Sequence, residues 1–296
     1  MSRPRQVLPN SFYLITRRCT QRQFLLRPDE ETNNAYLYCL IEAAQRFSID
    51  IVMMCAMSNH HHLVIYDRDG RYPEFLEHFH KMFARSQNAL RGRWENFWAA
   101  GQTSVVRLED PEDVLDKVVY VATNPVKDEL VERVHHWPGV NGYVALTQER
   151  TMAAVRPLHF FRAIGRMPRS VEMKLEIPQE LGERSSFLHA LKSRVAQLEE
   201  SCALDRRQTG RTVVGRRGIL RQSWRGAPTS FVEHRGLNPR IAARNVWSRL
   251  EALVRNRWFG RAYQRARAAW LDGREAVFPP GTYWLRRFAD VTIATA

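Results

Sequence analysis

The chain has 296 residues, of which 44% are hydrophobic and 26% are charged, and its formal net charge is +14 at pH 7. This length is enough for one large domain or two modest ones. No apolar run approaches the roughly 20 residues of a membrane span, and no apolar segment follows the N-terminal Met-Ser-Arg-Pro-Arg, so we expect no membrane span, no signal peptide and a cytoplasmic protein.

The first predicted elements are two strands with a helix between them. Residues 11–17 read as a strand, and residues 49–56 are almost continuously apolar, which predicts a second, buried strand. Between them, apolar residues at helical spacing over 36–47, preceded by three acids, predict a helix. A basic turn follows the first strand, and we expect three of its residues to contact phosphates: Arg17, Arg18 and Arg22.

Three consecutive histidines begin the next strand. Residues 57–65 read Met-Ser-Asn-His-His-His-Leu-Val-Ile. Successive side chains of a strand point to opposite faces, so His60 and His62 share one face and His61 lies on the other. The spacing therefore brings two imidazoles together on one surface.

A helix, a strand and a second helix come next. Pro73 opens a helix whose inner side is apolar, and residues 104–108 read as a strand. Asp110 and the proline after it are typical of a helix start. In this last helix the apolar residues form one stripe, and Tyr120 and Asn124, four apart, lie together on another side.

The predicted order is βαββαβ followed by a helix. This order is typical of the split βαβ, or ferredoxin-like, arrangement, in which helices cover one face of an antiparallel sheet. The sequence therefore predicts an α+β fold for its first half.

Two motifs resemble those of the single-tyrosine HUH endonucleases, the transposases of small insertion sequences and the REP-associated tyrosine transposases. The family pattern is a Met-Pro-Asn-His-x-His-Leu strand followed by a helix with Tyr-x-x-x-Asn-Pro-Val. Here residues 57–63 read Met-Ser-Asn-His-His-His-Leu, and residues 120–126 read Tyr-Val-Ala-Thr-Asn-Pro-Val. The resemblance covers roughly residues 8–145, and it implies the ferredoxin-like fold with the tyrosine helix laid against the sheet.

The resemblance implies DNA strand cleavage and transfer on single-stranded DNA, at hairpins or REP-like repeats. His60 and His62 would hold a divalent ion, Mg²⁺ or Mn²⁺, with Asn124 as a third ligand. Tyr120 would be the nucleophile and form a 5′-phosphotyrosine bond, which a free 3′-OH can reseal. In this family the tyrosine serves either its own subunit or a partner's, so a homodimer stays open.

Two departures from the family pattern leave alternatives open. Ser58 replaces a proline, and His61 occupies a position that is hydrophobic in the family. For His61 we favour a structural role over a metal ligand. Asn124 precedes a proline, so it fits a helix cap as well as a ligand. The main rival function is a nucleic-acid-binding regulator that keeps the fold without cleavage, and a small phosphate-ester hydrolase is a more distant one.

The excess positive charge lies in the second half of the chain. Residues 1–150 contain 18 Lys+Arg and 19 Asp+Glu, whereas residues 151–296 contain 27 and 12. The net charges are therefore −1 and +15. A basic face exposed to solvent would explain this, but nucleic acid is the partner that we favour.

The second half contains no motif that indicates catalysis. Helices are predicted over 187–198 and over 241–271, the latter with Gly273 as its stop. We expect the longer helix to turn seven apolar residues inward: Val246, Leu250, Leu253, Val254, Trp258, Ala262 and Trp270. The stretch 206–221 is rich in Gly and Arg, and four of its arginines are predicted to bind DNA: Arg211, Arg216, Arg217 and Arg221. We therefore divide the chain into an HUH domain, 1–150, and a basic, mainly helical nucleic-acid-binding domain, 151–296.

Overall fold

The computed structural model describes residues 4–230 and 239–295. Among these residues the central sheet has five strands in the order β2-β3-β1-β4-β7, and only β7 runs parallel to its neighbour β4. The first four strands form the predicted antiparallel, ferredoxin-like sheet, which confirms the fold class. The strands are β1 (Ser11–Arg18), β2 (Ile49–Ala56), β3 (His60–Asp67), β4 (Ser104–Leu108) and β7 (Ile241–Ala242).

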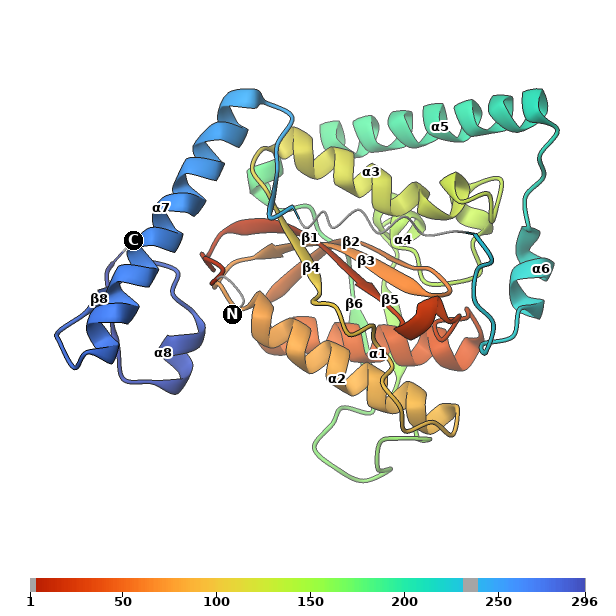
Figure 1. The fold of residues 1–296 in the computed structure, drawn as a ribbon. Coiled ribbons are helices and arrows are strands. Elements are labelled where there is room, and N and C mark those ends of the chain that lie inside the picture. The colour runs from red at the N-terminus through yellow and green to blue at the C-terminus, as the bar shows by residue number, and fades with distance from the viewer. Residues whose placement is uncertain (1–3, 231–238, 296) are drawn as a thin grey trace.

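Helices cover both faces of this sheet (Figure 1). Helices α1 (Glu30–Phe47) and α2 (Tyr72–Leu90) pack against each other on one face, and α3 (Pro111–Lys127) lies on the other. The side chain of Asp29 caps α1, and Asp110 and Asp113 form a capping box at the start of α3. Sequence signals at helix starts therefore located these helices well.

The main core lies between the sheet and the pair α1 and α2. Its largest fully buried side chains are aromatic, and Tyr36 makes edge-to-face contacts with Phe79 and Phe83 at 5.4 Å between ring centroids. Apolar side chains of α3, such as Val118 and Ala122, are fully buried and belong to the same continuous cluster. The sheet is thus covered on both faces, so β2 and β3 are buried almost throughout.

The chain after α3 packs back onto these layers. Short elements η2 (Val134–His136) and α4 (Tyr143–Thr147) lead to a hairpin that contacts α1, and η3 (Gln179–Leu181) precedes a long helix that packs on α3. The hairpin strands are β5 (Met152–Val155) and β6 (Ser170–Met173), the long helix is α5 (Arg184–Thr209), and α6 (Gly215–Arg221) follows. The helix predicted over 187–198 is therefore the middle of a longer one.

The last part of the chain forms a separate group of elements at the side of the sheet (Figure 1). These elements are α7 (Val246–Leu271), β8 (Val277–Phe278), α8 (Trp284–Phe288) and β9 (Thr292–Ile293). Within the described part of the chain, no helix is both long and apolar enough to cross a membrane.

Helix α7 differs from its prediction in its start and in its buried face. It begins at Val246, because the Asn245 side chain accepts hydrogen bonds from the first turn, and it ends as expected before Gly273, whose φ is 71°. The predicted inward stripe is wrong. Val246, Leu250, Leu253, Val254, Trp258 and Trp270 are exposed, whereas the buried residues are Ala252, Phe259 and Ala266, seven apart. Only this narrow row of three residues buries α7, so most of the apolar side chains of the helix stay exposed.

The proposed division at residue 150 stays a prediction. Strand β7 extends the sheet of the first half, and α5 lies along α3. The second half thus adds elements to the layers of the first half.

Candidate active site

The histidine pair of β3 faces helix α3, as strand alternation predicts. The imidazole rings of His60 and His62 are 4.8 Å apart between centroids, and the ring of His62 is 5.2 Å from that of Tyr120. His61 points to the other face of the sheet, where its ring contacts Tyr36 and His80. The structure therefore brings His60, His62 and Tyr120 together from two separate motifs.

Neighbouring side chains orient both imidazoles. Nδ1 of His60 lies 2.6 Å from Oδ1 of Asn59, an acceptor, so His60 carries its proton on Nδ1 and presents Nε2 as a free lone pair. Nδ1 of His62 lies 2.8 Å from the hydroxyl of Thr16. Nε2 of His62 is buried without a hydrogen-bond partner. A buried, unpaired imidazole nitrogen is costly unless it has another ligand, such as a metal ion.

Both histidines are held neutral at pH 7. Burial, helped by the nearby charges of Arg18 and Arg22, lowers the pKa of His60 to about 4. Burial lowers the pKa of His62 well below its ordinary value, and His60 and Arg18 lower it further. Only the neutral imidazole can bind a metal ion, so these shifts favour metal binding at neutral pH.

Tyr120 is half-buried on α3, one turn before Asn124. Burial raises the pKa of its phenol, and a hydrogen bond from the Asn124 side chain opposes that shift. The ammonium group of Lys127 lies over the phenol ring, 5.4 Å from its centroid. The helix continues through Pro125 to Lys127, so Asn124 is not the cap of a new helix. Its side chain is instead placed beside the tyrosine.

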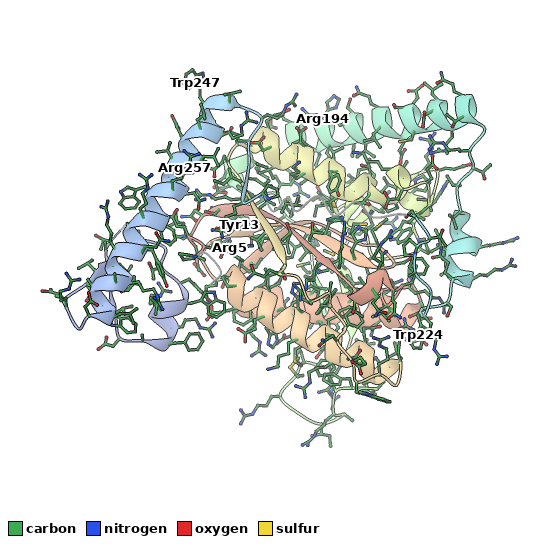
Figure 2. All side chains as sticks on the ribbon, in the orientation of Figure 1. Arg5, Tyr13, Arg194, Trp224, Trp247 and Arg257 are labelled. Atoms are coloured by element: carbon green, nitrogen blue, oxygen red, sulfur yellow. The ribbon has the colours of Figure 1, made fainter. Side chains whose placement is uncertain are left out.

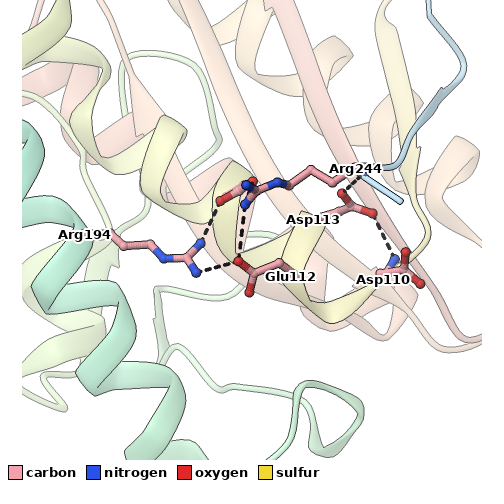
Figure 3. Close-up of polar contacts among 6 residues, drawn as sticks. Asp110, Glu112, Asp113, Arg194 and Arg244 are labelled. Carbon is pink, nitrogen blue, oxygen red and sulfur yellow. Dashed lines mark hydrogen bonds and ion pairs between the residues drawn. The ribbon is translucent and has the colours of Figure 1, made fainter. Parts of the chain in front are cut away.

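The first turns of α3 are fixed by two arginines from the second half of the chain (Figure 3). Arg194 on α5 contacts Asp116 at 2.7 Å and Glu112 at 2.5 Å. The backbone N–H of Arg244 donates to Asp113 at 2.7 Å, and its guanidinium lies 3.4 to 3.5 Å from Asp116 and Glu112. The helix that carries Tyr120 is therefore held at its start by residues far away in the sequence.

A cavity of about 520 Å³ opens beside His60, and its lining includes neither His62 nor Tyr120. His60, Arg18, Arg22 and Asp128 line one side of it, and parts of the segment 222–230 line the other. Arg22 donates to the backbone oxygen of Ser230 at 2.6 Å and to its hydroxyl at 3.0 Å. The second half of the chain thus completes the wall of this cavity.

The segment 222–230 is anchored at two further points. Three arginines, Arg91, Arg93 and Arg225, lie over the ring of Trp224 at 5.0 to 6.0 Å from its centroid. The backbone N–H of Phe24 donates to the oxygen of Gly226 at 2.8 Å. Sequence reasoning missed this segment, and its only signal was a tryptophan among arginines.

The arginines predicted to bind DNA occupy different surroundings. Arg18 and Arg22 line the cavity, but Arg17 lies on the opposite face of β1, where it donates to the oxygen of Gly101 at 2.6 Å. Arg211 is engaged by two carboxylates, those of Glu129 and Asp205. The three on or at the end of α6 are exposed and form no ion pair with any described residue: Arg216, Arg217 and Arg221. Arg17 and Arg211 are therefore the least available for phosphates at this cavity.

His61 belongs to a buried polar chain. Its Nδ1 lies 3.2 Å from the hydroxyl of Tyr36, and its Nε2 lies 3.0 Å from Nε2 of His80. The indole of Trp98 donates to the backbone oxygen of His80 at 3.0 Å. His80 was assigned no role from the sequence, because its partner is distant along the chain. The ring of Trp98 packs against that of His61, whereas Trp94 is 88% exposed.

The donor set fits a metal ion of a particular kind. Among the described residues, no group of three or more His, Cys, Asp or Glu side chains could hold a metal. A metal ion at this site would therefore bind the two free Nε2 atoms and take its other ligands from Asn124, the phenol, DNA phosphate or water. Nitrogen donors favour a transition ion such as Mn²⁺ over Mg²⁺.

The fold is similar to two solved transposase structures. One is a REP-associated tyrosine transposase bound to a REP hairpin, with 18% sequence identity and a TM-score of 0.41 over 48% of this chain and 82% of that chain. The other, from Deinococcus radiodurans R1, has a suggested transposase role, with 17% identity and a TM-score of 0.28 over 36% of this chain and 85% of that chain. No protein-family model matches the sequence, and no curated protein does.

Proposed function

We propose that this protein is a metal-dependent, single-tyrosine DNA transposase or a domesticated relative that cuts and rejoins single-stranded DNA. The observation that carries the proposal is a pair of neutral imidazoles, His60 and His62, in contact with each other, of which the ring of His62 lies 5.2 Å from that of Tyr120. The motif resemblance supports a hairpin-forming strand as substrate, and the cytoplasmic location expected from the sequence stays a proposal.

The reaction would be a transesterification at one phosphodiester. The phenol oxygen of Tyr120 attacks phosphorus, a P–O bond to tyrosine forms, and the P–O3′ bond breaks. The phenol proton is lost and the leaving 3′ oxygen ends as a 3′-OH, so the step needs no other reactant. A divalent cation, when bound, would supply charge stabilisation for the non-bridging oxygens.

The residues of this chain have separate roles in that step. His60 and His62 would hold the cation, and their partners Asn59 and Thr16 keep them in the required orientation. Burial raises the pKa of Tyr120, so the phenol is protonated before the reaction and loses its proton as its oxygen attacks phosphorus. Arg18 and Arg22 would contact the flanking phosphates, which for Arg22 means exchanging Ser230 for phosphate.

The test is a covalent adduct. With Mn²⁺ and a labelled single strand that contains a hairpin, the wild type should give an SDS-resistant adduct on Tyr120, located by mass spectrometry. Tyr120→Phe should abolish the adduct and bind the same strand with almost unchanged affinity, because it removes one hydroxyl. Tyr143→Phe is the matched control and should still react.

Two outcomes would contradict the proposal. An adduct that persists in Tyr120→Phe would move the nucleophile to another tyrosine, such as Tyr66 or Tyr143. Tight binding without any adduct, across Mn²⁺ and Mg²⁺ and several hairpins, would favour the non-catalytic nucleic-acid-binding regulator.

A further inference from the structure

A second cavity, of about 860 Å³, lies on the side of the molecule where α7 and α8 approach α2. In the ribbon, α7, β8 and α8 stand apart from the sheet, and Arg5 lies between the two (Figures 1 and 2). The volume is in the range of about 300–1,000 Å³ found for ligand pockets. We call this cavity, bounded by Tyr72, Phe259, Tyr263, Arg267 and Trp284, the α7 groove.

The α7 groove is separate from the catalytic cavity. Arg17 lines the groove, whereas its neighbour Arg18 lines the catalytic cavity, because successive residues of β1 face opposite sides of the sheet. The groove therefore opens on the α2 side, away from the histidine pair and Tyr120.

Aromatic rings form much of the groove wall. Tyr72, Phe259 and Tyr283 are buried, and Tyr263 contacts Phe278 at 5.6 Å between centroids. Trp284 is stacked on Phe288 at 5.9 Å between centroids, yet 52% of its surface is exposed. Exposed flat rings are typical platforms for unpaired bases, because every base has a π face.

Cations without carboxylate partners complete the wall. Arg5, Arg17 and Arg267 line the groove, and none of them forms an ion pair with a described residue. The acid in the lining is Glu77, whose oxygen lies 3.7 Å from Arg287. Nε of Arg17 is buried and has no hydrogen-bond partner. The groove thus presents positive charge that no carboxylate of a described residue neutralises, although Arg17 also donates to Gly101 and Thr103.

Two kinds of partner are considered for the α7 groove, a polyanion and a second copy of this chain, and the charge of α7 favours the polyanion. The helix contains six arginines and a single acid, Glu251, and among the described residues only Arg255 is paired, with Glu109 at 2.6 Å. Two such helices would repel each other. Interleaved arginines and exposed aromatic rings instead match the backbone and bases of a single strand.

We propose that the α7 groove binds a single-stranded segment of DNA outside the catalytic cavity, with a base on Trp284 and phosphates on Arg267, Arg5 and Arg17. The choice of single-stranded DNA as the ligand rests on the proposed function. It adds a second contact region, so that the protein holds its DNA at two places on opposite faces of the sheet.

The test measures binding without cleavage, in full-length protein that carries Tyr120→Phe. The probe is a fluorescein-labelled oligothymidine of about 12 nucleotides, within the usual range of single-strand sites. Trp284→Ala and Arg267→Glu should each weaken binding by about tenfold, as expected for the loss of one stacked ring or the reversal of one phosphate contact. Trp284 and Arg267 are not fully buried, so neither change is expected to unfold the protein.

Matched controls come from the N-terminal end of α7, outside the groove. Trp247→Ala removes a tryptophan that is 75% exposed, and Arg249→Glu reverses an arginine without an ion partner among the described residues. Both lie outside the groove lining and should change the affinity by less than about twofold. Figure 2 shows Trp247 at the far end of α7.

A crosslinking arm locates the strand directly. Oligothymidine with 5-iodouracil should crosslink to peptides that contain Trp284 or Tyr263. Crosslinks confined to residues 18–24 and 57–66, together with equal affinities for all four variants, would overturn the proposal that the α7 groove binds DNA. Polyglutamate that protects the Trp284 peptide where oligothymidine does not would assign the groove to an acidic protein and also overturn it. Absence of a Tyr120 adduct in wild-type protein would overturn the proposed function alone, because these measurements need no cleavage.

Discussion

The hydroxyl of Thr16 lies 2.8 Å from Nδ1 of His62, across from it on the neighbouring strand. This contact and the one between Asn59 and His60 leave both Nε2 atoms free on the same face as Tyr120. The metal affinity of the site should therefore depend on residues that do not touch the metal.

Thr16→Val keeps the shape of the side chain and removes its hydroxyl. We expect a loss of Mn²⁺ affinity of about 10- to 100-fold, the usual effect of removing a partner of a metal-binding histidine. Saturating Mn²⁺ should restore most of the adduct formation. Titration calorimetry measures the affinity, and Thr103→Val, which contacts Arg17 on the other face, is the control. Unchanged affinity in Thr16→Val would mean that His62 is not a ligand.

Leu191→Ala tests whether the two halves of the chain unfold together. Leu191 is fully buried on α5, which packs on α3. Truncation of a buried leucine to alanine costs about 2–5 kcal/mol. If the halves form one cooperative unit, urea unfolding should show one transition, shifted as a whole. Two transitions, of which only one moves, would support independent domains that meet near residue 150.

The three arginines on or at the end of α6 lie next to the catalytic cavity, since Gln222 lines it. Replacing Arg216, Arg217 and Arg221 together by alanine should flatten the dependence of log affinity on log salt by roughly 2, because each phosphate contact on a single strand contributes about 0.7. The single variant Arg274→Ala, whose arginine is paired with Asp272, should leave that slope unchanged. An unchanged slope in the triple variant would remove α6 from the DNA-binding surface.

His80 should make the folded state sensitive to acid. Burial, with a smaller effect of Arg17, lowers the pKa of His80 to about 3, against about 6.5 for an unfolded chain. As the pH falls below about 6.5, the unfolded chain takes up a proton that the folded chain refuses, so stability is lost on acidification. His80→Phe should therefore be less stable at pH 7, because His61 loses its partner, yet lose less stability between pH 7 and pH 5. Parallel stability curves for the two proteins would contradict this.

The sequence predicted the fold of the first half of the chain well, because its signals are local. Strand alternation separated His61 from His60 and His62, and Asp110 located the start of α3. Spacing of four residues on a helix correctly placed Asn124 beside Tyr120.

The predictions failed where contacts depend on residues far apart in the chain. The apolar residues of α7 form no single face, so counting them could not show that Ala252, Phe259 and Ala266 make its contact. His80 contacts Nε2 of His61, and Arg22 donates to the backbone of Ser230. Neither contact can be predicted from the residues next to it in the sequence. Arg17 and Arg18 are adjacent on β1 and so face opposite sides of the sheet, and the DNA contact predicted for each of them stays a prediction.

Substitutions in the segment 222–230 are expected to have a different effect from substitutions of the proposed ligands and nucleophile. The proposed chemistry depends on groups of β3 and α3, whereas Pro228, Thr229 and Ser230 border the cavity beside His60 and supply none of the proposed ligands or nucleophile. Substitutions in that segment would alter which nucleotides fit beside His60 while leaving the reactive atoms in place. Under the proposed function, the target preference of this protein is therefore able to change while the proposed metal ligands and nucleophile stay the same.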